Sequence, residues 1–164
     1  MEQRENIIDW FPMKEGASVL EVGAGCGAVT GALVRMASRV VANDLSKRRS
    51  LINAWRHRDA KNLELAVGNF NRVSEMLTEK FDYVTLIGVL EYAPSYMAGE
   101  DPFGTFLEKI NGLLKPDGEI LIAIENRLGM KYFEMGHLVT EMVTPEPNED
   151  YGKLSKRDGG RLGF

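Results

Sequence analysis

The stretch VLEVGAGCG, residues 19–27, joins a short apolar run to three glycines at alternate positions, Gly23, Gly25 and Gly27. An apolar run of this length that ends in glycine is typical of a buried β-strand followed by a tight turn. The absence of three side chains lets the backbone of such a turn approach a bound molecule closely. The stretch therefore predicts a strand that leads into a ligand-binding loop.

Strand-length apolar runs recur along the chain, with sequence of helical spacing between them: Ser18–Val22, Arg39–Asn43, Leu63–Val67, Phe81–Ile87 and Glu119–Ile124. Runs that are continuously apolar are typical of parallel strands buried on both faces. We therefore expect an α/β fold, a Rossmann-like and mostly parallel sheet with helices on both faces.

The intervening segments carry helix signals. Val29, Leu33 and Ala37 recur at the spacing of one helix face. Ser46 is a predicted N-cap, and it places Leu51 and Trp55 on the buried side of the helix that follows. The basic groups 47–49 and 56–58 then fall on the opposite face, which we interpret as solvated rather than as a nucleic-acid-binding surface.

A further helix is predicted to begin at Asp101 and Pro102, a favourable cap and first-turn pair. One apolar stripe follows on that helix: Phe103, Phe106, Leu107, Ile110, Leu113 and Leu114. The sequence Lys-Pro-Asp-Gly at 115–118 predicts a turn that leads into the fifth strand.

Composition excludes several functional classes. The chain has 164 residues, a formal charge of −4, and one cysteine, Cys26, with two histidines. A single cysteine makes no internal disulfide, and these residues are a poor set of metal ligands. The sequence contains no apolar run of the ~18 residues that a membrane span needs, and its first ten residues lack the pattern of a signal peptide. We expect a cytoplasmic protein with no bound metal, no membrane span and no nucleic-acid partner.

Two nucleotide-like ligands are compatible with the glycine loop. Gly23-x-Gly25-x-x-Ala28 satisfies the dinucleotide fingerprint, and Asp44 at the end of the second strand is placed to bind a ribose diol. An NAD-dependent oxidoreductase is therefore one hypothesis.

The surrounding residues favour a different cofactor. Glu21 stands two positions before Gly23, and the resulting E-x-G-x-G-x-G resembles the first motif of class I S-adenosylmethionine-dependent methyltransferases. The resemblance continues in order to about residue 130, through VVANDLS, LAVGNF, FDYVTLIGVLEYA and LLKPDGEILIAI.

The resemblance implies a site for S-adenosylmethionine. The 23–27 loop would pass beside the methionine moiety, Asp44 would accept hydrogen bonds from both ribose hydroxyls, and Asn69 and Phe70 would border the adenine. Asn69 replaces the family's more common Asp, but its amide oxygen can still accept from the adenine amino group. The full set of implied cofactor contacts is Glu21, Gly23, Ala24, Gly25, Asp44, Leu45, Asn69, Phe70, Ile87 and Gly88.

The same resemblance indicates where the acceptor lies. Glu91 and Tyr92 follow the fourth strand, where the family faces its substrate, and we expect them to position an acceptor hydroxyl. The sequence lacks the motifs of nucleic-acid methyltransferases there, so the predicted acceptor is a small molecule or a sugar, methylated on oxygen. The segments FDYVTLIGVLEYAPSYM, residues 81–97, and ILIAIENRLGMKYFEMGH, residues 120–137, also resemble methyltransferase modules of bacterial surface-polysaccharide gene clusters. This resemblance implies a glycan acceptor, an attached glycosyltransferase domain, and Glu125, Asn126 and Arg127 beside the acceptor.

The final residues depart from the family pattern. We expect a methyltransferase core over residues 1–144 and a loosely structured segment over 145–164, because no further strand pattern follows Ile124. The last two strands of the family's sheet are thus predicted to be missing, and the open sheet edge would favour a homodimer. A non-catalytic, methyltransferase-like binding module is the alternative that such an incomplete sheet leaves open.

Overall fold

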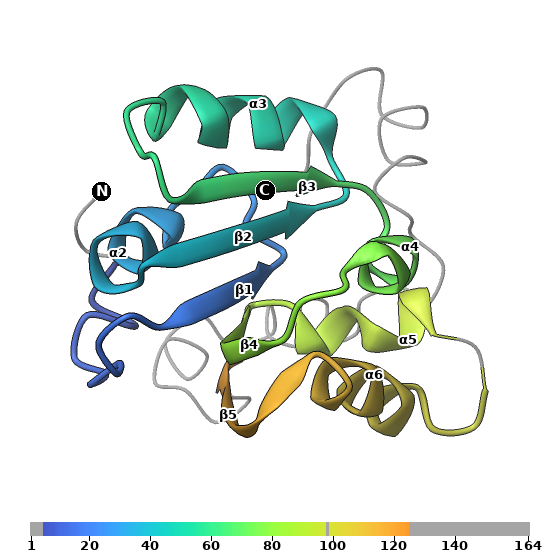
Figure 1. The fold of residues 1–164 in the computed structure, drawn as a ribbon. Helices are drawn as coiled ribbons and strands as arrows, with labels where there is room; N and C mark the ends of the chain where they lie inside the picture. The colour runs from blue at the N-terminus through green and yellow to red at the C-terminus, as the bar shows by residue number, and fades with distance from the viewer. Residues whose placement is uncertain (1–4, 98, 125–164) are drawn as a thin grey trace, which may run out of the picture.

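The computed structural model describes residues 5–97 and 99–124. Its centre is one parallel sheet of five strands in the order β3-β2-β1-β4-β5 (Figure 1). The strands are β1 (Ser18–Val22), β2 (Arg39–Asp44), β3 (Leu63–Val67), β4 (Phe81–Ile87) and β5 (Leu114–Ala123). The predicted Rossmann-like parallel sheet is confirmed, and three of the five predicted strands have the observed bounds.

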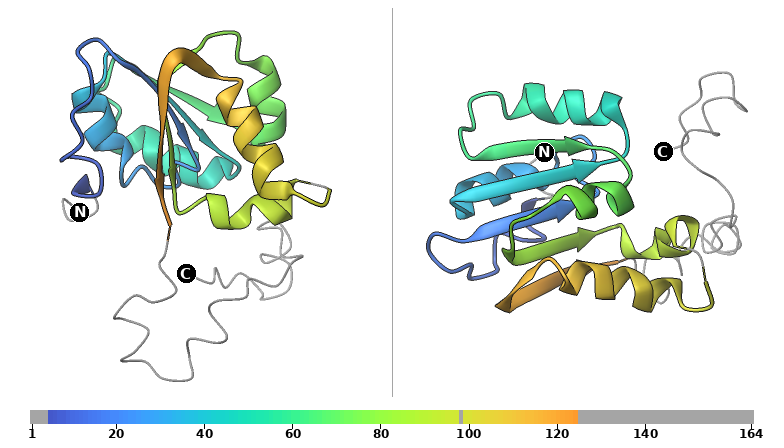
Figure 2. Two further views of the ribbon diagram at one scale, coloured as in Figure 1. Left: turned by 90° about the horizontal axis from the view of Figure 1, so that it is seen from below. Right: turned by 45° about the vertical axis from the view of Figure 1, so that its right-hand side comes forward.

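Helices cover both faces of the sheet, as Figure 2 shows edge-on. The helical elements are α2 (Thr30–Met36), α3 (Lys47–Arg56), α4 (Phe70–Met76), the 3-10 turn η1 (Leu90–Tyr92), α5 (Ala93–Tyr96) and α6 (Pro102–Asn111). On one face, α2 packs through Ala32 and Leu33 onto Val19 and Val40, a cluster called here the α2-side core. On the other, Phe106 and Ile110 of α6 pack onto Leu20 and Val84, called here the α6-side core.

The buried face of α3 differs from the prediction. Ser46 does cap the helix, because its side chain accepts a hydrogen bond from the Arg49 amide. However, Leu51 and Trp55, which were expected to be buried, are 52% and 70% exposed. The helix α3 instead buries the polar residues Ser50 and Asn53. It therefore packs through polar groups, and its large apolar side chains face outward. The periodicity identified the helix correctly but assigned the wrong face to the interior.

The entry into β5 also differs from the prediction. Asp101 caps α6 by accepting from the Gly104 amide, as expected, but Phe103 of the predicted stripe is 44% exposed. Residues 115–118 form an irregularity inside β5 rather than a separate turn, since the pairing with β4 shifts between Phe81 and Tyr83. This bulge brings Lys115 to the start of β4, where its ammonium pairs with Asp82.

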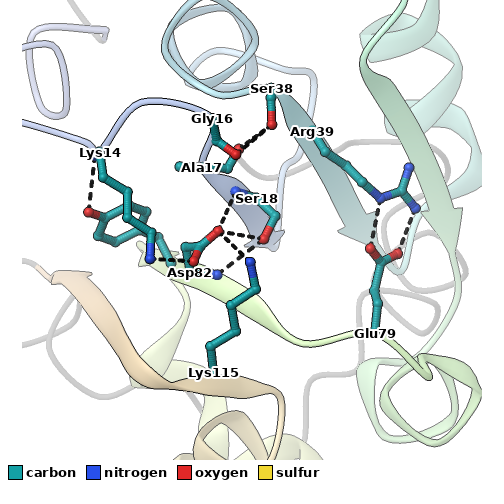
Figure 3. Close-up of polar contacts among 10 residues, drawn as sticks. Lys14, Gly16, Ala17, Ser18, Ser38, Arg39, Glu79, Asp82 and Lys115 are labelled. Atoms are coloured by element: carbon teal, nitrogen blue, oxygen red, sulfur yellow. Dashed lines mark hydrogen bonds and ion pairs between the residues drawn. The ribbon is translucent and has the colours of Figure 1, made fainter.

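The buried carboxylate of Asp82 joins the amino-terminal ends of the strands β1, β4 and β5. The side chain of Asp82 on β4 is 3% exposed and lies 2.5 Å from the Lys14 ammonium and 2.8 Å from that of Lys115 (Figure 3). The backbone amide and hydroxyl of Ser18 on β1 donate to the same carboxylate, at 2.8 and 2.9 Å. Burial opposes ionisation, but the hydrogen bonds from Lys115, Lys14 and Ser18 outweigh it and hold the pKa of Asp82 well below its usual range.

Asp82→Asn is expected to lower the free energy of unfolding by about 1–3 kcal/mol at pH 7, because charge-assisted hydrogen bonds are lost at a buried position. The folded-state pKa of Asp82 is depressed, so its stabilisation is present above the unfolded value of about 3.9 and is lost as the pH falls through the folded-state pKa. Denaturant unfolding at pH 7 and near pH 3 measures both effects. Asp117→Asn, at an exposed position of the same bulge, is the control and is expected to change little. Equal stability of the Asp82 variant and the wild type at pH 7 would contradict this account.

Candidate functional site

The carboxyl ends of the strands meet at one edge of the sheet, where ligands of open α/β sheets bind. The glycine loop follows β1, Asp44 ends β2, Gly68 and Asn69 follow β3, and Gly88 follows β4. The strand order reverses between β1 and β4, because the chain moves outward from β1 to β3 and then returns. The sequence-predicted cofactor residues are thus brought together at this edge from four strands.

Two cavities flank the glycine loop, and Val22, Gly23, Arg49 and Gly88 line both of them. The α6-side cavity is also lined by Asn43, Asp44, Leu45, Gly68, Asn69, Phe70, Asn71, Val89, Tyr92, Tyr96, Met97 and Phe106. The loop-side cavity is also lined by Ile7, Glu21, Ala24, Gly25, Cys26, Ala28, Val29, Ile87, Ala123 and Ile124. One elongated ligand that passes over Gly23 would therefore contact both cavities.

The three glycines of the loop all have positive φ angles, but the space that a side chain would meet differs at each position. A Cβ on Gly23 would lie 2.4 Å from Val89, so this glycine lets the loop approach the segment after β4. A Cβ on Gly27 would lie 2.4 Å from Asn53 Oδ1, so that glycine lets α3 approach the loop. A Cβ on Gly25 would meet no protein atom within 4 Å and would project into open space beside the loop-side cavity.

Asp44 holds the glycine loop against the end of β2. Its Oδ2 accepts a hydrogen bond of 2.9 Å from the Gly25 amide, and its Oδ1 accepts one of 2.7 Å from the Ser46 amide. The Arg49 guanidinium lies 3.2 Å from Oδ1. The carboxylate thus faces the α6-side cavity while it also fixes the loop that lines the other cavity.

A buried polar chain lies beneath the loop. The Thr30 hydroxyl donates to Glu21 Oε2 at 2.6 Å, and the Asn53 amide donates to the Thr30 oxygen at 3.1 Å. Glu21 is 5% exposed. Burial raises the pKa of Glu21 to about 7, the hydrogen bond from Thr30 opposes this shift, and the charge of Asp44 adds to it. This chain links β1 and α2 to α3 at the base of the site.

The basic end of α3 also contacts the loop, which corrects the prediction that groups 47–49 and 56–58 form only a solvated face. Arg56 donates to the Cys26 carbonyl, and His57 Nε2 lies 2.9 Å from the Gly27 carbonyl. A carbonyl can only accept, so the second hydrogen bond requires the proton on Nε2. Arg49 pairs with Asp44 as described above. Two arginines of α3 and the adjacent His57 thus brace the candidate site.

Asn69 and Phe70 form the far wall of the α6-side cavity. The Asn69 side-chain oxygen accepts from the Asn71 amide at 2.9 Å and caps α4. The Phe70 ring packs edge-on against Phe106, with ring centroids 5.4 Å apart. This wall offers one flat apolar side chain and one amide with hydrogen-bonding capacity remaining.

The two residues predicted to position the acceptor lie differently from each other. Tyr92 lines the α6-side cavity together with Asn69 and Phe70. Glu91 is not among the residues that line either cavity in the described part of the chain, and its Oε1 lies 3.8 Å from where a Cβ on Gly88 would stand. The predicted acceptor residues Glu125, Asn126 and Arg127 lie outside the described residues, as does the segment 145–164.

Several lining residues were not predicted from the sequence, among them Ile7, Arg49, Asn71, Tyr96 and Phe106. Among these, only Arg49 could have been predicted from the sequence. It follows the predicted N-cap Ser46 by three residues, which places it on the first turn of the helix, close to Asp44.

Within residues 5–97 and 99–124, no cluster of three or more His, Cys, Asp or Glu side chains is placed to hold a metal ion. The same residues contain no helix long and apolar enough to cross a membrane.

Comparison with known proteins gives consistent matches. Residues 20–120 match a family model described as a methyltransferase domain. The chain is 29% identical over 143 residues to the ubiquinone biosynthesis O-methyltransferase of Nitrosococcus oceani, with 85% of this chain and 57% of that protein covered. A stretch of 43 residues is 49% identical to the phosphoethanolamine N-methyltransferase of Triticum aestivum and covers 26% of this chain and 8% of that protein. The chain spans about half the length of the curated ubiquinone-biosynthesis relatives that it matches.

Solved structures share the fold. Phosphoethanolamine N-methyltransferase 1 of Haemonchus contortus, in complex with phosphoethanolamine and S-adenosylhomocysteine, superposes with a TM-score of 0.63 at 21% identity, covering 77% of this chain and 26% of that one. The N-methyltransferase NodS of Bradyrhizobium japonicum, in complex with S-adenosylhomocysteine, gives a TM-score of 0.61 at 20% identity, with coverages of 74% and 59%.

The raised pKa of Glu21 predicts a pH dependence of stability. Because the folded-state pKa of about 7 exceeds the unfolded value of about 4.3, the contribution of Glu21 is fully present below the unfolded pKa and is lost as the pH rises to about 7. Glu21→Gln is expected to remove a slope of up to about 1.4 kcal/mol per pH unit from the free energy of unfolding over this interval. Urea unfolding between pH 4.5 and 8 measures the slope, with Glu119→Gln, at an exposed position of β5, as the control. Parallel pH profiles for wild type and Glu21→Gln would contradict the assignment.

Proposed function

The chain belongs to the methyltransferase domain family, and from that premise we propose that it binds S-adenosylmethionine across the two cavities and that the whole protein methylates a small-molecule acceptor. The adenosine part would occupy the α6-side cavity, and the methionine part would lie along the glycine loop in the loop-side cavity. The observation that carries this proposal is the position of Gly25, a left-handed residue with open space where its Cβ would stand.

The residues of both cavities fit the two halves of this cofactor. Phe70 offers a flat apolar surface for a base, and Asn69 borders the same cavity with an amide. The loop-side cavity places the bare backbone of Gly23 and Gly25 beside Ala24 and Gly88, so an extended amino-acid chain can lie against the main chain without side-chain obstruction. Leu45 and Ile87 add apolar contacts at the ends of β2 and β4.

The hydrogen bonds of Asp44 determine how a ribose can bind. A carboxylate oxygen has two acceptor positions. The two acceptor positions of Oδ1 are occupied by the Ser46 amide and the Arg49 guanidinium. One of the two positions of Oδ2 is occupied by the Gly25 amide. One ribose hydroxyl can therefore donate to Oδ2 directly. The second reaches Oδ1 when the Arg49 guanidinium withdraws, so Arg49 competes with the ribose for Asp44.

When bound, S-adenosylmethionine supplies a methyl group on a sulfonium, which an acceptor oxygen can attack without further activation, leaving S-adenosylhomocysteine and a proton for solvent. The residues of this chain then have to align the acceptor and exclude water. Tyr92, which lines the α6-side cavity, is proposed to orient the acceptor from the edge of the cofactor. Glu91 lines neither cavity, but its carboxylate lies beside Gly88, which lines both, and from there it is proposed to orient the acceptor hydroxyl. Methylation on oxygen belongs to the same proposal, and the match to a ubiquinone biosynthesis O-methyltransferase over 85% of this chain supports it. The sugar or glycan acceptor expected from the sequence is not carried into this proposal, because the apolar lining of the loop-side cavity favours another class of acceptor, as argued below.

Gly25→Ala and Gly16→Ala form a matched pair for the cofactor assignment. Both glycines have positive φ, at +56° and +73°, and neither would place a Cβ within 4 Å of another protein atom. Both substitutions are expected to cost about 1–2 kcal/mol of stability, because an L side chain is strained in this conformation. Only Gly25→Ala is expected to weaken S-adenosylhomocysteine binding, about tenfold or more, since its methyl group would occupy ligand space. Calorimetric titration measures the affinity, and equal affinities of the two variants would remove Gly25 from the site.

Asp44→Ala is expected to weaken S-adenosylhomocysteine binding by about 1.5–3 kcal/mol, because charge-assisted hydrogen bonds to the ribose are lost together with the anchor of the Gly25 amide. Asp59→Ala is the matched control, since Asp59 is an almost fully exposed carboxylate that lines neither cavity. Equilibrium titration compares the two variants with the wild type. An unchanged affinity in Asp44→Ala would exclude Asp44 as a ribose ligand.

A further inference from the structure

The N-terminal turn, residues 5–11, is fastened to α2 by several independent contacts. Ile8 is buried in the α2-side core. The Arg35 guanidinium of α2 lies 2.6 Å from Glu5 and 3.4 Å from Asp9. A Cβ on Gly31 would lie 2.7 Å from Glu5 Oε1, so this bare position of α2 lets the turn approach the helix closely. The turn therefore has a fixed position beside the candidate site.

This position directs Ile7 to the loop-side cavity, where it forms an apolar wall with Val29, Ala123 and Ile124. Ile7 and Ile124 are large apolar side chains that remain exposed. The two charged side chains that also line this cavity are engaged with other groups: Glu21 accepts from Thr30, and Arg49 pairs with Asp44. The wall beyond the glycine loop is thus apolar.

We infer that the acceptor carries an apolar body, an alkyl chain or an aromatic ring, that packs on this wall while its hydroxyl faces the methyl donor. This inference rests on the proposed function, because it takes the glycine loop as the cofactor side of the same cavity. Covering Ile7 and Ile124 with apolar surface is favourable in proportion to the area removed from water. A sugar at this place would lose water from its hydroxyls and gain no hydrogen-bonding partner from the wall, which is unfavourable for each hydroxyl.

A series of 4-alkylphenols tests the inference by binding rather than by turnover. The chain is first titrated with S-adenosylhomocysteine, and the saturated complex is then titrated with 4-ethyl-, 4-butyl- and 4-hexylphenol and with methyl β-glucopyranoside. The affinity for the phenols is expected to rise about two- to fourfold for each added methylene, close to the transfer value for a buried CH₂. The glucoside is expected to bind more weakly than every phenol.

Ile7→Ser and Ile52→Ser provide the matched variants. Both isoleucines are 41% exposed, but Ile52 lies on α3 and lines neither cavity. At saturating S-adenosylhomocysteine, Ile7→Ser is expected to lower the affinity for 4-hexylphenol about fivefold, with the S-adenosylhomocysteine affinity of each variant titrated separately. Ile52→Ser is expected to change neither affinity. Arg35→Gln removes the two ion pairs of the turn but leaves Ile8 buried and alters no lining residue, so it is expected to reduce the dependence on chain length less than Ile7→Ser does.

The outcomes separate this inference from the proposed function. No binding of S-adenosylhomocysteine to the wild type would overturn both. Tight binding of S-adenosylhomocysteine with phenol affinities that do not depend on chain length, or that Ile7→Ser leaves unchanged, would overturn the apolar wall alone. A glucoside that binds as tightly as the phenols would also overturn it.

Discussion

The hydrogen bond from the Gly25 amide to Asp44 Oδ2 is the contact on which the arrangement of the site depends. It ties the loop after β1 to the end of β2 and so fixes the backbone that separates the two cavities. The loop can adopt this conformation only because Gly23, Gly25 and Gly27 accept positive φ angles. One carboxylate therefore shapes the glycine loop and is also the group that we propose accepts a hydrogen bond from a ribose, so the acidic residue at the end of β2 would serve both the fold and the proposed chemistry.

The two ends of the sheet use buried carboxylates in opposite ways. At the amino-terminal end, Asp82 is surrounded by two ammonium groups and Ser18, stays ionised and holds separate segments together. At the carboxyl end, Glu21 is buried with a single hydroxyl donor among the contacts described, and its pKa rises to about 7. The number of donors around each carboxylate, rather than burial alone, decides which form is stable.

The sequence was sufficient to predict what depends on local patterns. Continuous apolar runs located the parallel strands, and the side chains of Ser46 and Asp101 cap α3 and α6 as expected. The orientation of α3 could not be predicted, because the rule that apolar faces point inward fails when a helix packs through Asn53 onto Thr30. The bulge at the start of β5 and the approach of Ile7 and Phe106 to the cavities depend on contacts between residues distant in sequence, for which a single chain offers no periodic signal. The residues proposed to bind the cofactor could be named from the sequence because the successive segments that resemble the family contain them.

The structure of this chain in complex with S-adenosylhomocysteine, determined by crystallography, tests the central claim most directly. The account predicts adenine beside Asn69 and Phe70, a ribose hydroxyl within hydrogen-bond distance of Asp44, and the homocysteine chain over Gly23 and Gly25 in the loop-side cavity. A ligand bound away from the glycine loop, or with its ribose out of reach of Asp44, would contradict the account.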